Sequence, residues 1–219
     1  MFHCTKSRRA AIALLLLPGF SLAVPAMAEA PARAADPAAV LEAKMSLRDL
    51  WVEHIFWIRS YELAKKAGDT DQRAVAETEI VDNAKALAAT IAPFYGQPAA
   101  DALLELLAGH WGAVRAFNDA TVANSRAGQD KAVAKLTDNA REIAKFLSGA
   151  NPFLPEDAAF GLLAAHGAHH VAQSKEIASG AYPQEAATWH AMRKHMLVIA
   201  DAIADALGKQ FPEKFQHGS

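Results

Sequence analysis

Residues 50–54 read Leu-Trp-Val-Glu-His, residues 106–110 read Leu-Leu-Ala-Gly-His, and residues 162–166 read Leu-Leu-Ala-Ala-His. The closing histidines, His54, His110 and His166, are evenly spaced, since 110 − 54 = 56 and 166 − 110 = 56. Each stands where a helical core would ordinarily place an aliphatic side chain. A fixed interval of this kind is typical of repeat architectures, so the pattern indicates a unit of 56 residues.

The apolar residues around these histidines recur with the helical period, as Leu47, Leu50, His54 and Ile58 show, and no run alternates as a strand would. Segments rich in Gly, Asn and Pro interrupt the pattern at 68–69, 95–98, 124–128, 149–152 and 180–183. We therefore predict an all-α fold, a bundle of six helices built as three tandem helical hairpins. The single bundle domain spans 45–215, with repeats at about 45–97, 98–152 and 153–211.

The N-terminal 28 residues have the composition of a secretory signal peptide. Lys6, Arg8 and Arg9 precede the apolar stretch 10–24, and Ala-Met-Ala at 26–28 is a typical cleavage site. The apolar stretch is too short for a stable membrane span, so we expect no membrane insertion after signal cleavage and a periplasmic or secreted location. Both the general secretory and the twin-arginine routes stay open. Residues 29–44 are an Ala/Pro-rich lead-in, and 29–36 are expected to lack stable structure.

The charge balance argues against a nucleic-acid partner. The chain has 22 basic and 24 acidic residues, a net charge of −2. Removal of 1–28 would take three basic residues and no acidic ones, leaving 22 − 3 = 19 against 24, or −5. Such a chain offers no basic patch to neutralise phosphates. The only cysteine, Cys4, would leave with the signal peptide, so the remaining chain would be held together by its core without disulfides.

Residues at equal distances from a hairpin turn should face one another. This symmetry predicts three polar core pairs, His54–Asn83, His110–Asn139 and His166–His195. It also predicts two ion pairs within hairpins, Arg59–Asp82 and Arg115–Asp138, which are absent from the third repeat.

The repeated histidines predict a metal site, because neutral imidazole is a common ligand of zinc and copper. In the third repeat, His166 and His170 lie one helical turn apart on one face. The candidate ligands are His54, His110, His166, His170, His195 and Glu53. We expect a divalent transition metal, zinc or copper before iron, in a storage, buffering or sensing module.

Two other functions stay open on the sequence alone. The histidines could form a polar core layer, bonded to the facing asparagines, in a structural or protein-interaction module without metal. A hemerythrin-like di-iron carrier is an outside alternative, although only its His-x3-His element is present. Enzymatic motifs with a reactive Cys, a Gly-rich phosphate loop or His-Glu-x-x-His are missing, which argues against an enzyme. Closure of the repeats around an axis would bring the histidines together, whereas a solenoid would separate them.

Three segments carry a resemblance to a known family. They are LWVEH at 50–54, NPFLPED at 151–157 and KQFPEKF at 209–215. On these segments the chain resembles a family of small bacterial all-helical proteins of unknown function, over roughly residues 47–215. The resemblance implies a helical fold. It also implies a Glu before each repeated His, which this chain keeps only at Glu53.

Overall fold

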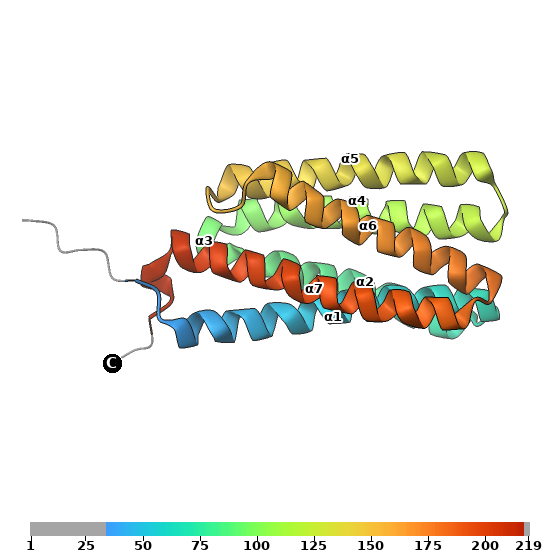
Figure 1. The fold of residues 1–219 in the computed structure, drawn as a ribbon, viewed down its shortest axis with the longest axis horizontal. Helices are drawn as coiled ribbons and strands as arrows, with labels where there is room; N and C mark the ends of the chain where they lie inside the picture. Colours follow the sequence, from blue (N-terminus) through green and yellow to red (C-terminus); the bar gives the residue numbers. More distant parts are fainter. Residues whose placement is uncertain (1–33, 217–219) are drawn as a thin grey trace, which may run out of the picture. The chain divides into compact units, whose positions relative to one another are not determined.

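The structure, a computed structural model, describes residues 34–216. The predicted signal peptide 1–28 and the first residues of the lead-in lie outside the described residues. Between 34 and 216 the chain forms helices and no strand, and Figure 1 shows their arrangement. The elements are α1 (Pro37–Ala67), α2 (Thr70–Ala89), the short α3 (Ala92–Tyr95), α4 (Gln97–Val122), α5 (Arg126–Ala150), α6 (Glu156–Ser179), α7 (Tyr182–Gln210) and the 3-10 turn η1 (Pro212–Lys214).

The six long helices pair as three hairpins, which confirms the predicted helical bundle. The pairs are α1 with α2, α4 with α5, and α6 with α7. Neighbouring hairpins join where α2 packs against α4, where α5 packs against α6, and where α7 returns to α1. The helices thus form a closed ring and not an open solenoid. Helix α6 also contacts α1 and α4, so the first helices of the three hairpins approach one another inside the ring.

The three hairpin turns share one backbone feature at positions 56 residues apart. Gly68, Asn124 and Gly180 have positive φ angles of 76°, 52° and 73°. This left-handed conformation ends a helix by turning its last amide groups back to free carbonyls, and Gly and Asn adopt it most easily. In the turns after α1 and α4, Asp69 and Ser125 then cap the next helix by accepting from the backbone amides of Gln72 and Gly128.

Helix α1 begins earlier than the sequence prediction. Its first residue is Pro37, and the Asp36 side chain accepts from the Ala38 amide at 2.8 Å. A carboxylate cap followed by proline is a strong start signal, because proline already has a helical φ and lacks the amide that would go unbonded. Residues 37–44, predicted to belong to the lead-in, are therefore part of α1, and the predicted domain start at 45 was wrong.

Both predicted ion pairs within hairpins are wrong. Arg59 binds Glu185 of α7 through two hydrogen bonds of 2.6 and 2.8 Å, and Arg115 binds Glu77 of α2. Asp82 instead pairs with Lys85 on its own helix. The prediction considered only the partner helix of each hairpin, whereas ring closure gives α1 and α4 a second neighbour each, α7 and α2.

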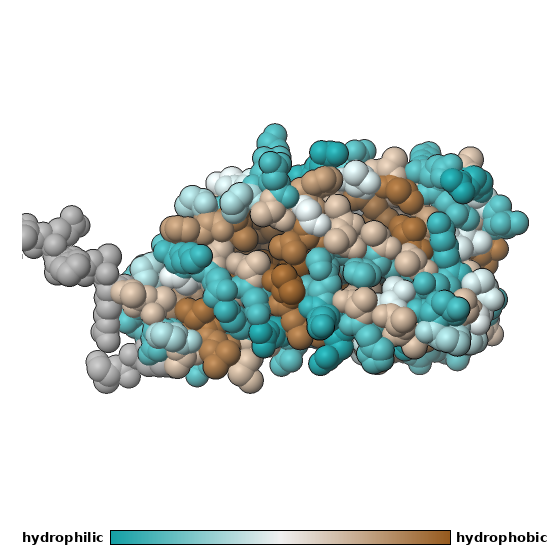
Figure 2. All heavy atoms as spheres, viewed as in Figure 1, coloured by the Kyte–Doolittle hydropathy of each residue, from teal (hydrophilic) through white to brown (hydrophobic). Residues whose placement is uncertain are grey.

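Aliphatic side chains fill the interior of the bundle, including the fully buried Ile55, Ile58 and Ile80. Hydrophilic residues cover much of the face seen in Figure 2, with hydrophobic residues visible between them. Within residues 34–216, no helix combines the length and the hydropathy that a membrane crossing would need.

Candidate metal centre

Four histidines meet in the interior of the ring. His54 lies on α1, His110 on α4, and His166 and His170 lie on α6. All four are buried, with exposed fractions of 5%, 7%, 2% and 1%. The helices that carry them are the first helices of the three hairpins, so ring closure brings together residues that are 56 positions apart in the chain.

The distances among these histidines are those of a compact cluster. Their six ring-to-ring distances run from 4.4 Å for His166–His170 to 5.9 Å for His54–His110 and His54–His170. The Nε2 atoms of His166 and His170 are 3.1 Å apart. One ring nitrogen from each histidine lies within 4.8 Å of those of the other three. The cluster is therefore already close to the size of a single coordination sphere.

The facing residues bond backbone carbonyls, and among the three predicted pairs only the Asn139 side chain also bonds the His110 side chain. Asn83 donates to the Leu50 carbonyl at 3.0 Å, Asn139 donates to the Leu106 carbonyl at 2.9 Å, and His195 Nε2 bonds the Leu162 carbonyl at 2.8 Å. Each accepting carbonyl lies four residues, about one turn, before a core histidine. Each facing residue lies at the predicted level along the opposite helix, but its side chain bonds a backbone carbonyl there, and the His54 imidazole has no protein partner.

The ring nitrogens consequently lack ordinary partners. Both nitrogens of His54, Nε2 of His110, and Nδ1 of His166 and His170 are buried without a hydrogen bond. A buried polar atom without a partner costs about 1–3 kcal/mol, and native structures contain few of them. His54 is the one cluster histidine with both ring nitrogens unbonded in this way, so its imidazole is the one most in need of a ligand.

Burial keeps all four imidazoles neutral. Loss of solvation lowers the pKa of His54 to about 3 and that of His110 to about 4. For His110 the Asn139 side chain partly opposes this shift. The pKa values of His166 and His170 also lie well below the ordinary range, first because of burial and then because of the neighbouring histidines. Neutral imidazole is the form that binds metal ions, so protons would not compete for the ligand atoms at neutral pH.

Two predicted ligands lie outside the cluster. His195 is half-buried on α7 and packs near His169, with ring centres 5.7 Å apart. Glu53 is exposed; it accepts from the Asn83 amide at 3.3 Å and from the Trp57 indole at 3.5 Å. The structure thus brings together His54, His110, His166 and His170 of the six candidates.

The arrangement suits a single transition-metal ion. Zinc binds imidazole nitrogens at about 2.0–2.1 Å in a tetrahedron, which places the nitrogens about 3.3–3.4 Å apart. The His166–His170 separation of 3.1 Å is near that value, and the ring nitrogens of His54 and His110 lie within 4.8 Å of them. Among residues 34–216 this is the only group of three or more His, Cys, Asp or Glu side chains with suitable geometry.

A second buried polar group was not predicted. Glu62 on α1 accepts from the Ser174 hydroxyl of α6, and burial raises its pKa to about 8. Gln173 and Arg59 both donate to Glu185. Ser174 and Gln173 lie on α6 within about one turn of His170. In the sequence these residues look like ordinary helix-surface side chains, and only the packing of α1, α6 and α7 buries them together.

Comparison of the chain with protein-family models, with curated proteins and with solved structures finds no match. The resemblance to a family of bacterial helical proteins therefore stays a prediction, and the function is argued from the site alone.

Proposed function

We propose that the protein binds one transition-metal ion through His54, His110, His166 and His170. The observation that carries this proposal is the convergence of four buried imidazoles whose ligand atoms lie within 4.8 Å of one another. Burial keeps them neutral, and five of their ring nitrogens have no protein partner. A metal ion would satisfy one nitrogen of each ring at once.

The ligand type favours zinc or copper. Imidazole nitrogens suit zinc, copper, iron and nickel, and the affinity of such sites for divalent ions rises to copper. The cluster contains neither a thiolate nor a carboxylate. Iron centres of the hemerythrin type use bridging carboxylates, so the hemerythrin-like di-iron carrier has no support in the described helices. A site closed by four protein ligands suits storage, buffering or sensing better than catalysis at an open position.

The rival function, a polar core layer in a structural or protein-interaction module, requires that the histidines be bonded within the protein. The asparagines that would bond them instead hold backbone carbonyls. His54 in particular has no bonded nitrogen. An unbonded polar layer would destabilise the core without fixing its register, which favours metal binding. Export to the periplasm or the exterior, where such a module would meet free metal ions, is part of the proposal.

The proposal is tested by metal titration of the purified protein after chelator treatment. Zinc(II) and copper(II) are titrated at pH 7 against a competing chromophoric chelator, and bound metal is counted by elemental analysis. We expect one ion per chain. Because each histidine supplies one of four ligands, His170→Ala should weaken binding by about tenfold or more.

His195→Ala is the matched control, since it removes a histidine outside the cluster from a neighbouring helix. It should leave the affinity unchanged. Circular dichroism establishes that both variants fold. Binding no tighter than millimolar for zinc, copper, nickel and iron would overturn the proposal. An equal loss of metal affinity in His170→Ala and His195→Ala would also overturn it.

A further inference from the structure

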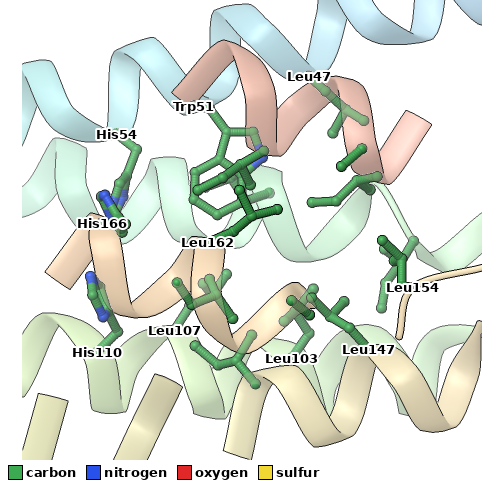
Figure 3. A pocket seen from close by; sticks show the side chains of 18 of the residues that line it. Leu47, Trp51, His54, Leu103, Leu107, His110, Leu147, Leu154, Leu162 and His166 are labelled. Atoms are coloured by element: carbon green, nitrogen blue, oxygen red, sulfur yellow. The ribbon is translucent and has the colours of Figure 1, made fainter. Parts of the chain in front are cut away.

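An apolar cavity of about 60 Å³ lies directly beside the histidine cluster. His54, His110 and His166 form one end of it, and aliphatic side chains line the rest, as Figure 3 shows. His170 is not part of the lining. Three of the four candidate ligands thus face the cavity, while the fourth approaches the cluster from another side.

The cavity follows the axis around which the hairpins close. Its lining includes residues at equivalent positions of all three repeats, such as Leu87, Ile143 and Ile199, and Ile91, Leu147 and Ile203. A third set is Leu47, Leu103 and Ala159. The third repeat has a methyl group where the other two have isobutyl groups, so space is left at the centre of the bundle.

The lining has almost no group that would hold water. Apart from the histidines, its polar side chains are Trp51 and Thr90. The Thr90 hydroxyl already donates to the Leu87 carbonyl at 2.7 Å. The indole N–H of Trp51 is buried without an acceptor, and its ring meets the edges of the His54 and His166 rings. A buried water needs two to four polar partners. Only the histidine end of the cavity, together with the Trp51 indole, offers unbonded polar atoms, so we expect the aliphatic end to stay dry.

We propose that this cavity takes up a small uncharged diatomic molecule, of the class of dioxygen, nitric oxide and carbon monoxide, and admits it to the face formed by His54, His110 and His166. The size fits, because an apolar cavity of about 150 Å³ binds benzene or xenon and this one is smaller. The lining carries no charge that would recognise an ion. Uptake of the molecule into the cavity does not depend on metal binding, whereas its contact with a bound metal rests on the proposed function.

Xenon is the probe for the cavity itself. Xenon-129 NMR of the metal-free protein should show one saturable site, and crystals under xenon pressure should place the atom between Leu107 and Trp51. Ala159→Leu restores the side chain found at the two equivalent positions, and Ala140→Met introduces the side chain found at Met196, its equivalent. Both residues line the cavity, so both variants should abolish saturable xenon binding.

Ala84→Met is the matched control, because Ala84 is equivalent to Ala140 but lies outside the cavity lining. It should retain xenon binding. Absence of saturable binding in the unmodified protein would overturn the proposal, and so would equal binding in all variants. The measurement uses metal-free protein, so its failure is distinguishable from failure of metal binding.

Carbon monoxide on copper(I)-loaded protein tests access to the metal. An ion held by four histidines has no free position, so carbon monoxide would bind copper(I) in exchange for one imidazole, and infrared spectroscopy should then detect one bound carbon monoxide stretch. Its association should be slower in Ala159→Leu and Ala140→Met than in Ala84→Met, while copper affinity is unchanged in all three. If xenon binds in the cavity but carbon monoxide does not bind the copper(I)-loaded protein, the proposal that the cavity leads to the metal is wrong.

Discussion

His166 and His170 are one helical turn apart on α6, and their Nε2 atoms lie 3.1 Å apart in the centre of the ring. Both imidazoles are neutral, because burial holds their pKa values well below the ordinary range. One helix thus supplies two ligand atoms in fixed geometry, and His54 and His110 approach them from α1 and α4. The proposed metal site would therefore be largely formed in the metal-free protein.

Replacing a cluster histidine by an apolar residue should stabilise the metal-free protein. Neither ring nitrogen of His54 has a partner, so His54→Leu removes two unsatisfied groups from the core. We expect the free energy of unfolding to rise by about 1–3 kcal/mol, measured by urea unfolding in the presence of a chelator. If the free energy of unfolding of His54→Leu instead falls by a similar amount, the histidine is bonded within the core, as the structural-module alternative requires.

Bound metal should stabilise the unmodified protein more than the His54→Leu variant. An ion that binds only the folded chain adds about 2.7 kcal/mol at a hundred times its Kd, which for a chain of this size raises the Tm by about 5–10 °C. Thermal unfolding with and without zinc should show this shift in the unmodified protein and in His195→Ala. In His54→Leu, which loses one of the four proposed ligands, a tenfold weaker affinity should reduce the stabilisation to about 1.4 kcal/mol, and an undiminished shift there would place the ion elsewhere.

Glu62 should make stability fall as the pH rises from about 4.5 to about 8. Burial raises its pKa from 4.5 to about 8 in the folded chain, so the folded state holds a proton that the unfolded state releases. Its contribution is full below pH 4.5 and is lost as the pH rises through 8, by up to about 1.4 kcal/mol per unit. Urea unfolding between pH 6.5 and 8.5 should show this decline.

Glu62→Gln keeps an acceptor for Ser174 and does not titrate, so the difference in unfolding free energy between the unmodified protein and the variant isolates Glu62 and should change over this range. The buried histidines act in the opposite direction in both proteins, because their depressed pKa values reduce stability as the pH falls through about 6.5. Parallel profiles for the variant and the unmodified protein would show that Glu62 does not hold the proton.

Arg59 and Arg115 are equivalent by position but should differ in their contributions. The Glu185 side chain bound by Arg59 is only 2% exposed, whereas Arg115 and Glu77 are 47% and 39% exposed. Arg59→Met leaves a buried carboxylate without its cation and should destabilise the fold by about 1–3 kcal/mol. Arg115→Met should cost about 0–1 kcal/mol. If chemical denaturation shows the same decrease in unfolding free energy for Arg59→Met and Arg115→Met, the two ion pairs do not differ as burial predicts.

Local patterns in the sequence predicted the hairpins well. The period of the apolar residues gave the helices, and the breakers at Gly68, Asn124 and Gly180 lie at the left-handed turns. His54, His110 and His166 meet, as the sequence predicts for a closed ring but not for a solenoid, and His170 joins them from the same helix as His166. His195 and Glu53, which the sequence also offered as ligands, lie outside the cluster. Such features depend on residues close together in the chain, where spacing and backbone preference decide the outcome.

Contacts between hairpins could not be predicted in this way. Nothing in the helical period distinguishes a closed ring from a solenoid, because the return of α7 to α1 depends on packing between distant segments. For the same reason the sequence could not show that Arg59 binds Glu185, which lies on α7 and far away in the chain. Symmetry about a turn gave the height of Asn83 but not the direction of its side chain, which reaches the Leu50 carbonyl one turn away from the His54 ring.

X-ray absorption spectroscopy of the protein loaded with one equivalent of zinc tests the four-histidine centre most directly. We predict a first shell of four nitrogen atoms at about 2.0–2.1 Å, with the outer-shell scattering of imidazole rings. His170→Ala should lose one imidazole from that shell, and His195→Ala should leave it unchanged. A shell of six oxygen atoms, or the same spectrum in His170→Ala, would contradict the account.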